Sequence, residues 1–98
     1  MGPELKPSHT VTAKLIKGSD AAAVVAVLMS SSPSAVVQDH GTYLSLENEG
    51  SLFFNLTDIG EELGRPYDIP TFLAILASYT GQVDVQDNAV LISETYST

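Results

Sequence analysis

The pattern of apolar and polar positions along the chain predicts nine elements of secondary structure. Apolar residues at every second position indicate strands, whereas wider apolar stripes indicate helices. We expect strands at residues 10–16, 35–38, 42–47, 52–56, 82–86 and 89–93, and helices at residues 21–29, 58–63 and between Asp68 and Gly81. This order, β-α-β-β-β-α-α-β-β, predicts an α+β fold of two layers, with antiparallel sheets and the helices packed on one side.

The last of these helices has the clearest apolar stripe. We expect Asp68 to cap it and Gly81 to end it. The stripe consists of Phe72, Leu73, Ile75, Leu76 and Tyr79, and we expect Phe72, Leu76 and Tyr79 to belong to the core rather than to a contact surface. In the strand that follows, Val83 and Val85 are expected to point inward.

The domain organisation follows from the same pattern. Residues 1–9 contain Pro3 and Pro7 and have no periodic apolar positions, so we expect a flexible N-terminal tail. Residues 10–98 are expected to form a single domain, because no linker-like boundary interrupts them. No apolar stretch is long enough to cross a bilayer, and no targeting segment is visible, so we expect a cytoplasmic protein.

Charge narrows the possible partners. The net charge is −8, and it is unevenly placed: residues 1–17 carry three lysines and Glu4, whereas residues 18–98 carry Arg65 against eleven carboxylates. Phosphates and anionic lipids attract basic surfaces, so we expect neither nucleic acid nor membrane as a partner. The acidic charge is compatible with a simple solvated surface, or with a basic protein partner.

The residues offer little chemistry. There is no cysteine, and neither His9 nor His40 has another histidine nearby in the sequence, so we expect no metal and no cofactor. Nucleophile elbows and phosphate-binding loops are absent. The adjacent carboxylates Glu61 and Glu62 are better explained as a solvated helix face than as an acid–base pair. The residues alone therefore predict a small, non-catalytic binding or regulatory module, monomeric when free.

Two linked motifs carry a resemblance. Leu63-Gly64-Arg65-Pro66-Tyr67, followed after a helix by LASYTGQV at residues 76–83, resembles the effector or coupling proteins of bacterial soluble di-iron multicomponent monooxygenases. The similarity is strongest to the toluene and alkene monooxygenase members, with the phenol hydroxylase and methane monooxygenase regulatory proteins more distant. It extends over about residues 10–95.

The resemblance implies a function without catalysis. Members of this family hold no cofactor and dock on the hydroxylase component, over the helices that carry its di-iron centre. Docking there changes the active site, oxygen activation and the coupling of electron use to hydroxylation or epoxidation of a hydrocarbon. The resemblance therefore implies that this chain is a regulatory component and that its partner is a hydroxylase.

Candidate contact residues are inferred from position, since the motif does not assign roles. Arg65 lies among carboxylates at a corner and is read either as an internal clamp or as a partner contact. Further candidate contacts, from expected exposure, turn position or tail position, are Lys6, Asn48, Glu49, Asn55 and Tyr67. A different class of function stays open: the order of elements also permits a ferredoxin-like, small-molecule-sensing domain, which ligand-induced dimerisation would reveal.

Overall fold

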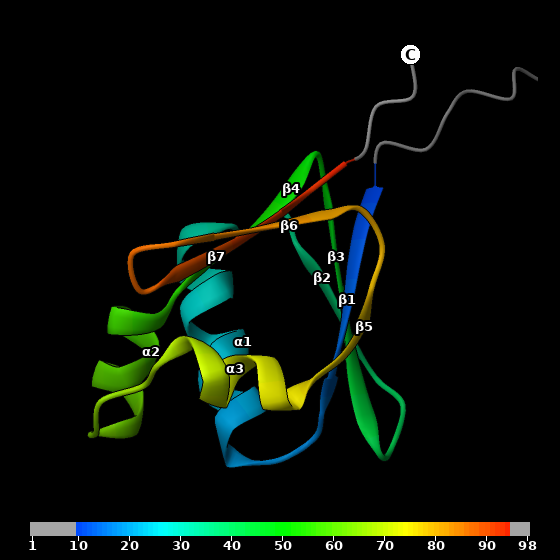
Figure 1. The fold of residues 1–98 in the computed structure, drawn as a ribbon. Helices are drawn as coiled ribbons and strands as arrows, with labels where there is room; N and C mark the ends of the chain where they lie inside the picture. Colours follow the sequence, from blue (N-terminus) through cyan, green and yellow to red (C-terminus); the bar gives the residue numbers. More distant parts are fainter. Residues whose placement is uncertain (1–9, 95–98) are drawn as a thin grey trace, which may run out of the picture.

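The computed structural model describes residues 10–94 and builds them into two antiparallel sheets and three helices (Figure 1). One sheet has the strand order β2-β3-β1-β5 and the other has the order β4-β7-β6. Along the chain the elements are β1 (Thr10–Ile16), α1 (Ser19–Ser31), β2 (Val36–Asp39), β3 (Tyr43–Glu49), β4 (Ser51–Asn55), α2 (Leu56–Leu63), α3 (Ile69–Ile75), β5 (Leu76–Tyr79), β6 (Gln82–Gln86) and β7 (Ala89–Ser93).

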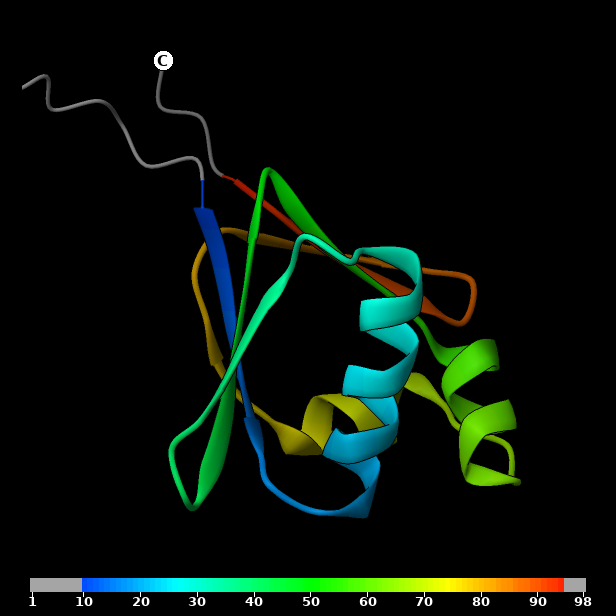
Figure 2. The ribbon, with the colours of Figure 1, turned by 180° about the vertical axis from the view of Figure 1, so that it is seen from behind.

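The three helices lie on one side of both sheets, in the angle between them (Figures 1 and 2). Alternation along each strand sends one apolar set toward the helices, as expected for sheets covered on one face. A single hydrophobic cluster results, to which the large, fully buried residues Leu15, Leu46, Leu52, Phe54, Val24, Leu28, Ile59, Phe72 and Ile92 belong. The predicted α+β class, antiparallel sheets and one-sided helices are confirmed.

One element differs from the prediction. The third helix ends at Ile75, and the last part of its expected stripe forms strand β5 instead. Strand β5 pairs with β1, where Leu76 lies opposite Leu15, and the amide of Thr80 donates a hydrogen bond to the carbonyl of Thr12. The open edge of β1 thus gains a ladder of hydrogen bonds that a continued helix could not supply, so tertiary pairing overrides the helical period.

A tight turn at Gly81 moves the chain from the first sheet to the second. Gly81 has a φ of 106°, and a Cβ there would run into the backbone carbonyl of Ser93. Only glycine fits both conditions easily. The turn makes β5 the edge of the first sheet and β6 the edge of the second, so two consecutive edge strands border the same face as α3 (Figure 1).

Two predictions fall partly outside the described residues. The tail of residues 1–9 lies outside them, and so do the last four residues of the predicted domain. The described elements share one core, and the full extent of the domain stays a prediction. None of the helices in the described part of the chain is long and apolar enough to cross a membrane.

Candidate functional site

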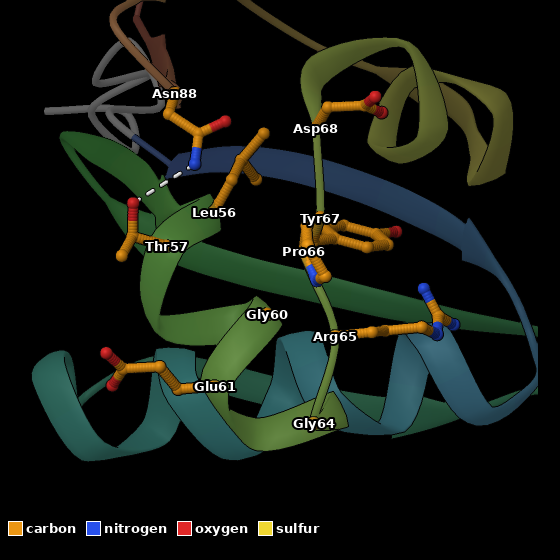
Figure 3. A pocket seen from close by; sticks show the side chains of 10 residues that line it. All are labelled: Leu56, Thr57, Gly60, Glu61, Gly64, Arg65, Pro66, Tyr67, Asp68 and Asn88. Carbon is orange, nitrogen blue, oxygen red and sulfur yellow. Dashed lines mark hydrogen bonds between the residues drawn. The ribbon is translucent and has the colours of Figure 1, made fainter.

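The first sequence motif forms a corner between α2 and α3 (Figure 3). Helix α2 ends at Gly64, which has a φ of 77°, and the amides of Gly64 and Arg65 donate to the carbonyl of Gly60 at 2.8 and 3.0 Å. This is the usual glycine-dependent way to close a helix. At the other side of the corner, the Asp68 carboxylate accepts from the amide of Thr71 at 3.1 Å and caps α3.

The cap at Asp68 depends on ionisation. The hydrogen bonds that Thr71 donates lower the pKa of Asp68 below its ordinary value. A carboxylate with a lowered folded-state pKa stabilises the fold above its unfolded pKa, and this stabilisation is lost as the pH falls through the folded pKa. The start of α3 is therefore held best in the ionised state that Asp68 has near neutral pH.

Arg65 ties this corner to the beginning of α1. One guanidinium nitrogen lies 2.7 Å from a carboxylate oxygen of Asp20, and the guanidinium also stands 5.9 Å from the centre of the Tyr67 ring. The internal clamp predicted for Arg65 is therefore present, but its partner comes from α1 and not from the carboxylates close in sequence. Because the pair is partly exposed, it contributes about 1 kcal/mol or less.

Tyr67 is not a surface residue, so its predicted exposure is wrong. The side chain is only 4% exposed and belongs to the hydrophobic core, because the corner turns the ring inward. Its buried hydroxyl makes no hydrogen bond within the described residues. Burial first, and then the charge of Asp20, raise the pKa of Tyr67 to about 12. This residue positions the corner and also lines the groove described below, and its role as a partner contact stays a prediction.

The other candidate contacts do not gather into one patch. The Asn48 side chain bonds the carbonyl of Ser51 at 2.9 Å, Glu49 is exposed at the end of β3, and Asn55 caps α2 by accepting from the amide of Asp58 at 3.2 Å. The β3–β4 connection and the corner after α2 lie well apart (Figure 1). Lys6 lies outside the described residues.

A groove of about 600 Å³ lies between α2, the corner and the β6–β7 turn (Figure 3). Its wall at the turn is held by a hydrogen bond of 3.0 Å between the Asn88 amide and the Thr57 hydroxyl, and by the amide of Leu56 donating to the carbonyl of Asn88. The residues that line it are Leu56, Thr57, Gly60, Glu61, Gly64, Arg65, Pro66, Tyr67, Asp68 and Asn88.

Gly60 sets how closely α2 approaches the corner. A Cβ at this position would lie 2.7 Å from the backbone oxygen of Arg65. We expect Gly60→Ala to lower the free energy of unfolding by roughly 1–2 kcal/mol, because overpacking against backbone outweighs the better helix propensity of alanine. Thermal melts measure this effect. Gly18→Ala is the control, since nothing lies within 4 Å of a Cβ at that position and the backbone is extended there. Equal losses of stability in the two variants would contradict the close approach at Gly60.

A second candidate surface is the face formed by α3, β5 and β6, which we call the uncharged face (Figure 1). Residues 69–83 carry no charge in a strongly acidic chain, and the one charged residue of these three elements, Asp84 of β6, alternates with Val85 and so projects from the opposite side of the strand. Large apolar side chains are nevertheless exposed on it: Leu73 is 40% exposed, Tyr79 47% and Val85 48%. Apolar, charge-depleted surfaces of this kind are typical of the centres of protein–protein interfaces.

The strand register places Val85 on the same side as α3. Val85 lies in line with Val90 and Phe54 across the second sheet, and the Phe54 ring packs against Phe72 of α3 with centroids 4.9 Å apart. Val85 and Tyr79 were expected to be inward or in the core. Both instead extend past the helices at the sheet edges, where nothing in the described chain covers them. The signal for this face in the sequence was its lack of charge.

The described residues contain no group of three or more side chains that could hold a metal ion.

Comparisons with known proteins identify the fold and the family. A chain in a structure of the phenol hydroxylase–regulatory protein complex superposes with a TM-score of 0.79 at 23% identity, covering 88% of this chain and 99% of that chain. The soluble methane monooxygenase regulatory protein B superposes with a TM-score of 0.71 at 21% identity, covering 94% of this chain and 70% of that chain. At these identities the two structures support the fold.

Sequence similarity supports the family. The chain is 30% identical over 69 residues to the stimulatory component DmpM of phenol 2-monooxygenase from Pseudomonas sp. (strain CF600), an alignment that covers 70% of this chain and 77% of that protein. The model of the MmoB/DmpM family matches residues 9–93, nearly the whole chain. The chain therefore belongs to the MmoB/DmpM family.

Proposed function

We propose that this protein is the non-catalytic regulatory component of a multicomponent di-iron monooxygenase. In this role it docks on the hydroxylase component and tunes its active site, its oxygen activation and the coupling of electron use to hydroxylation or epoxidation of a hydrocarbon. The observation that carries the proposal is the family match over residues 9–93. The relatives are named a stimulatory component and a regulatory protein, which supports the same role.

The docking surface that we propose is the uncharged face. Covering Leu73, Tyr79 and Val85 would remove apolar area from water without desolvating any charge of residues 69–83. Lys6, Asn48, Glu49 and Asn55 are proposed as further contacts with the same partner, together with the exposed part of Arg65.

Regulation of this kind requires a difference in affinity. The protein must bind one hydroxylase conformation more tightly than another, because equal binding to both shifts nothing. A tenfold shift in the equilibrium between the two hydroxylase conformations needs a difference of about 1.4 kcal/mol in binding free energy. A protein interface supplies this without any chemical group acting on substrate. The proposal therefore needs no cofactor in this chain, and we expect the free protein to be a monomer. We place it in the cytoplasm, a location that the family assignment supports.

A titration tests this function. Adding the protein to purified cognate hydroxylase and its electron-transfer partners should raise product formation and the ratio of product to reductant consumed, up to saturation. Binding should also weaken as salt rises, because charge attraction is screened. Turnover that stays constant over the full titration would contradict the proposal. The ferredoxin-like alternative would be favoured by ligand-induced dimerisation without a hydroxylase, but the family membership does not favour it.

A further inference from the structure

The groove beside α2 has the form of a binding site on an otherwise solvated end of the molecule. Its volume of about 600 Å³ lies within the range of sites that hold a ligand or a side chain of a partner. The floor is apolar, with Leu56, Gly60 and Pro66 among its residues, and the polar groups stand around it (Figure 3). At Gly64 nothing lies within 4 Å of the place that a Cβ would take, so the backbone there is open to close approach.

The charge around the groove is almost entirely negative. Glu61 and Asp68 line it, and Asp58, Glu62 and Asp87 are neighbours of lining residues in the sequence. None of these five carboxylates forms an ion pair within residues 10–94. Arg65 is the one cation in the lining, and Asp20 already binds it at 2.7 Å. An occupant of this groove therefore meets a field that attracts positive charge.

The groove is continuous with the uncharged face. Asp68 lines the groove and also caps α3, which forms part of that face. A protein that covers α3 is thus brought next to the groove. The uncharged face offers it apolar contact, whereas the groove adds charge and a defined recess, so the two surfaces have complementary roles in one docking event.

We propose that the groove binds a basic segment of the hydroxylase, which inserts an apolar side chain over Gly60 and Pro66 and brings a lysine or arginine to Glu61. This inference rests on the proposed function, since it assigns a second contact to the same partner. It places much of the salt dependence of docking at the groove, because residues 69–83 of the uncharged face carry no charges to screen.

Two neighbouring residues of α2 allow a matched test. Glu61 lines the groove, whereas Glu62 is an exposed carboxylate on the same helix that does not line it. Glu61→Lys and Glu62→Lys make the same change in net charge on the same helix. We expect Glu61→Lys to raise the dissociation constant for the purified hydroxylase at least about tenfold at low salt, and Glu62→Lys to raise it no more than about threefold.

Melting temperatures of the variants and hydroxylase binding by the unchanged protein make the outcome decisive. Melting temperatures of both variants should stay near that of the unchanged protein, since both side chains are exposed; Glu61→Gln and Glu62→Gln provide the same comparison with a smaller change if a lysine variant fails to fold. Equal effects at the two positions, or no effect at either, would overturn the proposal that the groove binds the hydroxylase. If the unchanged protein still binds the hydroxylase, the proposed function is upheld. If the unchanged protein also fails to bind the hydroxylase, both proposals are overturned.

Discussion

Val85→Asp should weaken binding to the hydroxylase at least about tenfold. When the variant is present in limiting amounts, activation of the hydroxylase should fall in proportion. A carboxylate at this position has to lose water when the uncharged face is covered, and an unpaired charge placed in an interface costs several kcal/mol. Since 1.4 kcal/mol is already a factor of ten, even partial desolvation should produce the loss. A titration of hydroxylase with the variant, followed by turnover and by direct binding, measures it.

Val36→Asp is the matched control. Val36 and Val85 are both valines with 48% exposure, and both lie on edge strands, β2 of the first sheet and β6 of the second. The two strands lie on different sides of the molecule (Figures 1 and 2). Any general cost of placing an acid on an edge strand should affect both variants equally, which their melting temperatures will show. Equal losses of binding would remove the uncharged face from the docking surface.

The sequence predicted the strands and helices wherever local pattern and tertiary contacts agree. The apolar alternation of β1, the cap at Asp68 and the glycine at the end of α2 all specify structure within a few residues. Such signals are read directly from neighbours along the chain, since capping and strand alternation depend on short-range geometry.

Long-range pairing decided the features that the sequence did not predict. Leu76 fits a helical stripe as well as a strand, and only the free edge of β1 selects the strand. Arg65 has several carboxylates nearby in sequence, yet the corner points it to Asp20, 45 positions away. The same corner buries Tyr67. In each case the residue type permits two outcomes, and contacts made by distant segments choose between them.

The candidate surfaces also differ in whether local pattern or distant contacts determine them. Exposure and turn position selected Asn48 and Asn55, whose side chains are mainly engaged in local hydrogen bonds. The uncharged face required knowledge of which apolar residues stay outside the core, because Phe72 and Leu73 look alike in the sequence but only Leu73 is exposed. Apolar pattern alone does not separate core from interface, since both remove the same kind of surface from water.

Phe72→Ala should lower the free energy of unfolding by about 3–5 kcal/mol, which is the usual cost of removing a fully buried phenylalanine. Phe72 has no exposed surface, and its ring packs against Phe54 at 4.9 Å between centroids, joining α3 to the second sheet. The total free energy of unfolding of a small domain is about 5–15 kcal/mol, so Phe72→Ala would remove a large fraction of it.

The adjacent residue supplies the control for this last variant. Leu73→Ala, at a position that is 40% exposed, should cost less than about 1 kcal/mol because much of the side chain is already in water. At about 4–8 °C per kcal/mol for a domain of this length, Phe72→Ala should melt at least roughly 12 °C lower than the unchanged protein. Leu73→Ala should instead melt nearly normally and bind the hydroxylase less tightly. If Leu73→Ala proved the more destabilising of the two, the orientation of α3 against the second sheet would be wrong.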